Sequence, residues 1–233
     1  MVLLGTIVNA AAIIAGSVAG WFLPKLSKGM ERTVVQGIGL ALCVLGFMTA
    51  MKTEQYLWMV VSLAAGGVIG EWAQVERRFE QAGSWLERKV VRGGHGEVGK
   101  AFVAASLVFC IGAMAILGAI ESGVRGNHDI LLTKALMDGL LALMFTSALG
   151  IGVIFSAAAV FAYQGLLTLA AAWVTAYVPA SALETIVIEV SAVGGVLIIG
   201  IGVNLLEIKQ IHVANLLPSV VVMAIAMVFI TVW

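Results

Sequence analysis

Long apolar stretches separated by short polar segments run along the whole chain. A helix needs about 20 apolar residues to cross about 30 Å of hydrocarbon. All such stretches should be helical, because an open strand in lipid leaves its backbone groups unpaired. The sequence predicts about eight spans, at residues 2–23, 33–51, 56–73, 101–120, 131–149, 151–176, 183–206 and 217–233. The short last stretch and the weak boundary at residues 147–152 leave a count of seven open.

Composition supports the same fold class. The chain is 61% hydrophobic and 11% charged, whereas soluble domains are about 45–50% apolar and about 25% charged. We therefore expect an all-α, polytopic transmembrane helical bundle forming a single domain over residues 1–233, with the lipid bilayer as its main partner. The net charge of zero gives no reason to expect nucleic acid. No Cys or His spacing matches a metal site, so we expect no metal and no cofactor.

Basic residues fall mainly in alternate loops, which predicts the orientation of the chain. Ten of the 13 Lys and Arg residues lie after the first, third and seventh predicted spans: Lys25, Lys28, Arg32, Arg77, Arg78, Arg88, Lys89, Arg92, Lys100 and Lys209. Such loops remain in the cytoplasm. We expect a multi-pass protein of the bacterial cytoplasmic (inner) membrane with both termini outside.

The one long loop contains an amphipathic pattern over residues 75–92. Its apolar residues recur at steps of three and four, with one tryptophan beside the same stripe: Val75, Phe79, Ala82, Trp85, Leu86 and Val90. This pattern predicts an interfacial helix on the cytoplasmic side, with Phe79, Trp85 and Leu86 in contact with the membrane. A simple anchor and a docking segment for a cytosolic partner are both compatible with it.

A weak internal repeat is visible at an offset of 101 residues. Residues 37–42 read GIGLAL, and residues 138–143 read DGLLAL. The offset predicts two three-helix repeats, at residues 1–73 and 101–176, with additional spans over residues 183–233. Because each repeat holds an odd number of spans, the second would be inverted, as in many secondary transporters.

Four polar residues fall at membrane depth in different spans: Asn9, Asp138, Gln164 and Glu189. At a rise of about 1.5 Å per residue, Asn9, Asp138 and Glu189 lie roughly 10–13 Å below the outer surface and Gln164 somewhat deeper. Ionisable residues at such depth usually face a partner, a cavity or a pathway.

Two interpretations of Asp138 are open. Lys134 lies one helical turn before Asp138, so the two side chains can form an ion pair. If Lys134 instead reaches outward, Asp138 is free to meet Glu189, and two carboxylates at one depth need a cation or a proton between them. For Glu189 alone, a helix-to-helix hydrogen bond from the protonated acid is the alternative. For Asn9 and Gln164 the alternative is ordinary interhelical hydrogen bonding.

Several short motifs together carry a family resemblance. They are GTIVNA at residues 5–10, GGVIGE at 66–71, FCIGAMAILG at 109–118, KALMD at 134–138, SALGIG at 147–152, YQG at 163–165, EVSAVGG at 189–195 and NLLP at 215–218. On these the chain resembles the uncharacterised bacterial membrane family YdfK/YqgA. The resemblance implies a multi-span inner-membrane protein and supplies no functional residue.

We expect a small secondary transporter or channel for an ion or small solute, working as a homodimer and coupled to a monovalent cation or proton. Its site would use Asp138 and Glu189, with Asn9, Gln164 and Lys134 beside them. One alternative is a non-transporting scaffold or sensor that uses the helix at residues 75–92. A membrane-embedded lipid enzyme is the least favoured, because no nucleophile or metal set is visible in the sequence.

Overall fold

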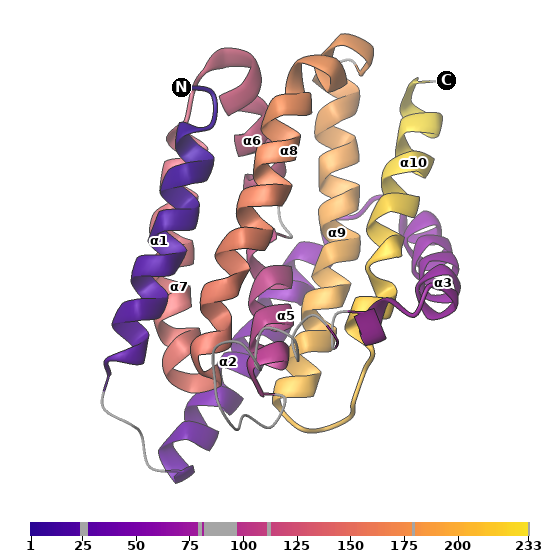
Figure 1. The fold of residues 1–233 in the computed structure, drawn as a ribbon. Coiled ribbons are helices and arrows are strands. Elements are labelled where there is room, and N and C mark those ends of the chain that lie inside the picture. The colour runs from indigo at the N-terminus through magenta and orange to yellow at the C-terminus, as the bar shows by residue number, and fades with distance from the viewer. Residues whose placement is uncertain (24–27, 79–80, 82–96, 111–112, 179, 233) are drawn as a thin grey trace. The chain divides into compact units, whose positions relative to one another are not determined.

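The computed structural model describes residues 1–23, 28–78, 81, 97–110, 113–178 and 180–232. Every regular element in these ranges is a helix, which confirms the predicted all-α fold class (Figure 1). The elements are α1 (Leu4–Trp21), α2 (Lys28–Ala50), α3 (Tyr56–Trp72), α5 (Glu97–Cys110), α6 (Ala113–Arg125), α7 (Asp129–Leu149), η1 (Ile151–Phe155), α8 (Ser156–Tyr177), α9 (Ala180–Leu205), η2 (Val213–Leu216) and α10 (Pro218–Val232).

Within the described ranges, six helices are long and apolar enough to cross a membrane, and α5 with α6 makes a seventh if the two form one bent span. Their axes differ by 59°, so the predicted span at residues 101–120 corresponds to two helices that are long enough to span only together. Helix α3 is apolar but has only 17 residues. The expected count of about eight is therefore close to the six or seven observed.

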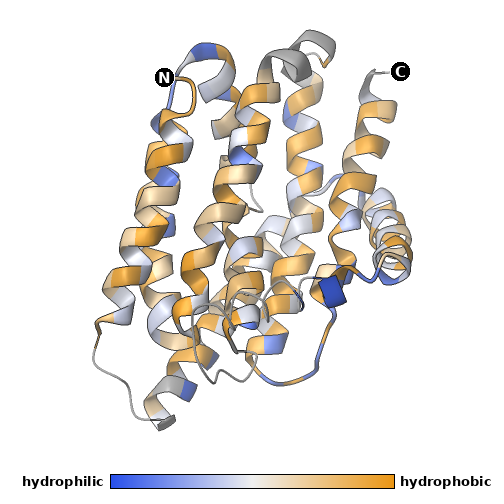
Figure 2. Cartoon of the chain, in the orientation of Figure 1, coloured by the Kyte–Doolittle hydropathy of each residue, from blue (hydrophilic) through white to orange (hydrophobic). Residues whose placement is uncertain are grey.

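The apolar character of the helices extends along their length, while hydrophilic residues gather mostly at helix ends and connections (Figure 2). Several helices carry large apolar side chains on the surface. Leu57, Leu136 and Leu166, for example, are 72%, 69% and 70% exposed. A water-soluble protein rarely exposes so many large apolar side chains. Together with the long apolar helices, this exposure indicates a multi-pass membrane protein.

The chain divides into two compact units. Unit 1 consists of Met1–Glu31 and Glu80–Val174, and unit 2 of Arg32–Phe79 and Thr175–Trp233. Each unit thus joins helices from two distant parts of the sequence. The two inverted repeats expected from the sequence, and the single domain, stay predictions.

Unit 1 is held together by close contact between α1 and α7, which run in parallel. A Cβ added at Gly16 would lie 2.0 Å from the carbonyl oxygen of Gly139, and one added at Gly20 would lie 2.4 Å from that of Leu143. Only glycine permits this approach of the two backbones. Helix α7 then ends at Gly150, whose φ of +90° is costly for other residues, so the boundary left open at residues 147–152 separates two helices.

Unit 2 uses glycines in the same way. Helices α2 and α9 run antiparallel, and a Cβ at Gly46 would lie 2.5 Å from the carbonyl oxygen of Gly195. Helix α3 crosses the start of α10, where a Cβ at Gly70 would lie 1.8 Å from the carbonyl oxygen of Asn215.

Candidate functional site

The polar centre of unit 1 begins with an ion pair on α7. Lys134 Nζ donates to Asp138 Oδ2, and the two residues are one helical turn apart. Both are buried inside the unit, with 6% and 4% of their surface exposed. Lys134 therefore turns toward Asp138 and not outward, as the first of the two interpretations of Asp138 expected.

Asn9 of α1 connects this pair to α8. Its side-chain amide donates from Nδ2 to Gln164 Oε1 at 3.2 Å, and it lies close to the Asp138 carboxylate. Asn9 and Gln164 are both fully buried. The structure thus brings four of the five expected site residues into one network, which joins α7, α1 and α8.

The network is not saturated. Asn9 Oδ1 and Gln164 Nε2 have no hydrogen-bond partner among the described residues. Exchanging the oxygen and nitrogen of both amides would still leave one acceptor and one donor without a partner. The hydroxyls of Thr6 and Thr168 are buried and likewise unpartnered in the described part of the chain. An unmade hydrogen bond of a buried polar group costs about 1–3 kcal/mol, so the centre of unit 1 is suited to a further hydrogen-bonding group.

A break in a span lies beside the same network. Helix α5 ends at Cys110, and α6 begins at Ala113. Cys110 interacts electrostatically with both Lys134 and Asp138. The rings of Phe109 and Phe145, stacked with centroids 5.9 Å apart, join α5 to α7 at this level.

Glu189 of unit 2 has a different environment. Its Oε1 accepts from the Glu54 backbone N–H at 2.8 Å, and its Oε2 accepts from the Thr53 hydroxyl. Thr53 Oγ1 in turn accepts from the Gln55 backbone N–H at 3.1 Å. The carboxyl group is thereby fixed at the start of α3, where the helix dipole favours negative charge. This contact joins α9 to the connection between α2 and α3, and the protonated form of Glu189 stays a prediction.

Asp138 and Glu189 belong to different units. Their expected meeting around a cation or proton stays a prediction. Within its own unit, each carboxyl group already has a partner: Lys134 for Asp138, and the connection between α2 and α3 for Glu189.

Unit 2 contains a second polar cluster that the sequence did not predict. Asn215 donates from Nδ2 to Glu71 Oε2 at 2.6 Å and accepts from the Glu76 backbone N–H at 2.7 Å. Glu76 Oε2 accepts from the Ala214 backbone N–H at 2.8 Å. The only sequence signal is an Asn shortly before a proline that begins a helix. The cluster fastens the end of α3 to the start of α10.

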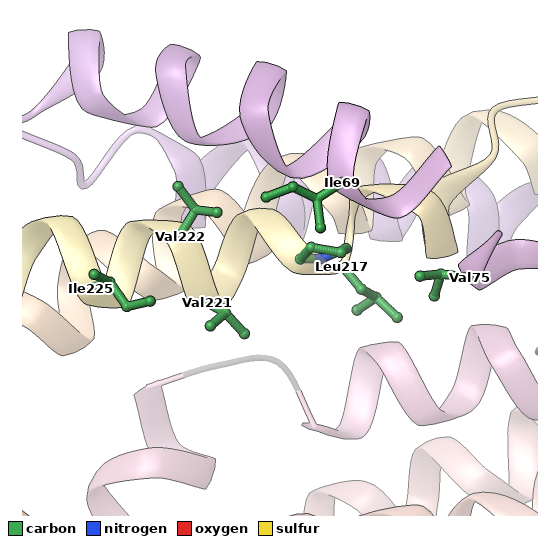
Figure 3. Close-up of a pocket in the computed structure, with 7 residues that line it drawn as sticks. Ile69, Val75, Leu217, Val221, Val222 and Ile225 are labelled. Atoms are coloured by element: carbon green, nitrogen blue, oxygen red, sulfur yellow. The ribbon is translucent and has the colours of Figure 1, made fainter. Parts of the chain in front are cut away.

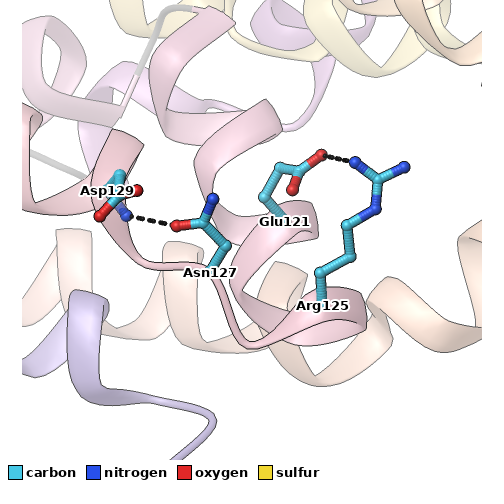
Figure 4. A network of polar contacts seen from close by, with 4 residues as sticks. All are labelled: Glu121, Arg125, Asn127 and Asp129. Atoms are coloured by element: carbon cyan, nitrogen blue, oxygen red, sulfur yellow. Dashed lines mark hydrogen bonds and ion pairs between the residues drawn. The ribbon is translucent and has the colours of Figure 1, made fainter.

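The connection between α6 and α7 is organised by short-range contacts. Arg125 pairs with Glu121 at 2.8 Å, and the Asp129 backbone N–H donates to Asn127 Oδ1 at 3.0 Å (Figure 4). The Ser122 hydroxyl lies 2.9 Å from the Val2 carbonyl oxygen and 2.8 Å from His128 Nδ1. A serine has one proton, so when Ser122 donates to Val2 its oxygen accepts from His128. This contact ties the N-terminus to the connection.

The expected interfacial helix lies mostly outside the described residues. Residues 75–78 are helical, whereas Phe79, Trp85 and Leu86 fall outside the described ranges. Among the described residues, no group of three or more His, Cys, Asp or Glu side chains is placed to hold a metal ion.

Comparisons with known proteins support the family resemblance. A family profile described as a protein of unknown function (DUF554) matches residues 4–228. The chain is 32% identical over 224 residues to the uncharacterized membrane protein YdfK of Bacillus subtilis, covering 94% of this chain and 93% of the relative. It is 28% identical over 221 residues to the uncharacterized protein YqgA of Escherichia coli, covering 93% and 92%. No solved structure matches. The expected resemblance is confirmed.

Proposed function

Since the chain belongs to the DUF554 family, whose named relatives carry no assigned activity, we propose its function from its own residues: a small secondary transporter or channel for an ion or small solute. It works in the bacterial cytoplasmic membrane, with the basic loops in the cytoplasm. The buried pair of Lys134 and Asp138, linked through Asn9 to Gln164, carries this proposal.

Energetics favour a functional role for the pair over a structural one. A charged side chain at the centre of a membrane helix costs about 2.5–3.5 kcal/mol. Replacing a buried ion pair by apolar residues of similar volume is often neutral or stabilising. A chain that needed only packing at this point would be served by apolar residues. A charge pair beside amide groups that lack hydrogen-bond partners suits a site that binds and releases an ion or a small solute.

Protonation gives the pair a mechanism of coupling. A proton on Asp138 removes the carboxylate charge, so that Lys134 loses its counter-ion and repels cations. Loss of that proton restores the ion pair. Asn9 lies close to Asp138 and hydrogen-bonds Gln164, so that a rearrangement of the pair can reach α8. The bent pair of α5 and α6 lies beside Lys134 and Asp138, and broken or bent spans are common at the sites of secondary transporters.

A catalytic function is less well supported. The Ser122 and His128 contact has the residue types of a nucleophile and its base. Ser122, however, is fully buried and bonds the Val2 carbonyl oxygen, so its hydroxyl serves as a tether. We propose that the protein is not an enzyme. The scaffold function requires the segment at residues 75–92, and its deletion should leave ion or solute flux intact if our proposal is right.

Reconstituted vesicles provide the test. Purified protein is placed in liposomes, and proton, Na⁺ and K⁺ fluxes are followed under an imposed gradient. We expect a flux that Asp138→Asn abolishes and that Asp129→Asn, an exposed carboxylate of the connection between α6 and α7, leaves unchanged. Equal fluxes for the two variants, or none with any of these ions for the native chain, would refute ion transport through this network. The same purified protein reports whether the expected homodimer forms, from its mass in detergent.

A further inference from the structure

Unit 2 has an apolar hollow of about 520 Å³ along one side of α10 (Figure 3). Ile69 of α3, Val75, and α10 residues such as Val221 and Ile225 line it, and every lining side chain is apolar. It runs from Leu217 to Ile225, a rise of about 12 Å along the helix. A hollow with this length and this apolar lining can take part of a hydrocarbon chain.

Helix α10 has two unlike faces. Met223 and Met227 are fully buried against the rest of the unit, and the Ser62 hydroxyl contacts the Met223 sulfur at 3.4 Å. Val221 and Ile225 are instead 60% and 66% exposed. The hollow therefore lies on the face of α10 that is turned away from the rest of unit 2, and in a membrane helix a lipid chain can occupy such a face.

One end of the hollow adjoins basic side chains. Arg78 follows Val75 by three residues in the same helical turn, so it lies above the same face. Arg78 is exposed and has no ion-pair partner among the described residues, and Arg77 has only a 3.4 Å contact with Gln74. Trp72, just before, is 88% exposed, as aromatic residues at the membrane interface often are.

Two acidic groups are also near this end, and both have other partners. Glu71 accepts from the Asn215 amide, and Glu76 accepts from the Ala214 backbone N–H. Their carboxylates are held toward the start of α10. The guanidinium of Arg78 therefore remains available to an anion.

We propose that this hollow binds one acyl chain of a phospholipid whose phosphate is held by Arg78. Guanidinium groups bind phosphate through paired, charge-assisted hydrogen bonds. The lipid belongs to the leaflet that faces the basic loops. This site is independent of the transport proposal, because it uses only residues of unit 2 and none of the polar network of unit 1.

Native mass spectrometry of the full chain in detergent tests the phosphate contact. Phosphatidylglycerol and a diacylglycerol with the same chains are titrated separately. We expect the native protein to bind phosphatidylglycerol more tightly. Arg78→Gln should weaken that binding about fivefold, which corresponds to about 1 kcal/mol for a basic residue near anionic lipid, and leave diacylglycerol binding unchanged. Arg32→Gln, an exposed arginine elsewhere in unit 2, is the matched control.

A second pair of variants tests the hollow itself. Val221→Trp fills it and should weaken the binding of both lipids, whereas Phe229→Trp, at an exposed site on α10 outside the hollow, should not. The proposal is overturned if Arg78→Gln has no effect on phosphatidylglycerol, or if the two tryptophan variants behave alike. Efficient cross-linking of Ile225→Cys with Leu86→Cys would also overturn it, because the chain's own segment would then occupy the hollow.

Discussion

Lys134 and Asp138 neutralise one another inside unit 1. Variants that remove one charge or both charges can therefore separate what the pair contributes to stability from what it contributes to function. Lys134→Met alone leaves a buried carboxylate without its cation, which should destabilise the protein by about 3–5 kcal/mol. Lys134→Met with Asp138→Leu removes both charges and should recover most of that loss. Thermal unfolding in detergent measures both variants. If the double variant unfolds at as low a temperature as the single variant, the pair has a structural role. If the double variant is stable but shows no ion flux, the pair has the role in transport that we propose.

Glu189 makes a different prediction, because its oxygens hold the connection between α2 and α3. Glu189→Ala leaves the Thr53 hydroxyl and the Glu54 N–H without their acceptor, at about 1–3 kcal/mol for each group. Thr53→Val with Glu189→Ala should destabilise by less than the sum of the two single changes, since both remove the same contact. Unfolding midpoints of the four proteins measure this. Glu184→Gln, at an exposed position on α9, is the control. Strictly additive losses of stability would contradict a hydrogen bond between Thr53 and Glu189.

At the scale of elements, glycines decide which helices pack. In α3, Gly70→Ala puts a methyl group 1.8 Å from the Asn215 carbonyl oxygen, so α3 and the start of α10 must separate. We expect a loss of several kcal/mol, since overpacking alone costs about 1–3 kcal/mol and the Asn215 cluster is disturbed as well. In α2, Gly37→Ala meets nothing within 4 Å and should stabilise the helix by roughly 0.5–1 kcal/mol. We expect Gly70→Ala to lower the melting temperature and Gly37→Ala to raise it. Equal shifts for the two variants would contradict the close contact at Gly70.

The same scale shows how far sequence reasoning extends. Apolar length located α1, α2, α7, α8, α9 and α10, and helical spacing gave the contact between Lys134 and Asp138. The break between α5 and α6 was not predicted, because FCIGAMAILG is as apolar as an unbroken span. The partners of Glu189 were also missed. Thr53 lies 136 residues away, and no local periodicity reports a contact at that separation.

For the whole molecule, the two units each combine early and late helices, such as α1 with α7 and α2 with α9. Hydropathy identifies helices without indicating which ones pair, and 27 glycines offer too many candidate contact faces. The three-dimensional structure shows which glycines meet a neighbouring backbone closely, among them Gly16, Gly20, Gly46 and Gly70. This arrangement also means that unit 2 cannot be completed until α9 and α10 have been made, because its early helices wait for them while unit 1 ends at Val174.

Orientation in the membrane belongs to the whole molecule as well, and it is testable with single cysteines. In a chain with Cys43→Ala and Cys110→Ala, we expect Arg125→Cys to react with a membrane-impermeant maleimide in right-side-out vesicles, and Lys209→Cys to react only after permeabilisation. The positive-inside bias is the reason, since Lys209 belongs to the basic loops and Arg125 does not. Replacing Arg125 gives up only an exposed ion pair with Glu121, worth about 0–1 kcal/mol. The opposite labelling pattern would invert the protein and move the lipid held by Arg78 to the other leaflet.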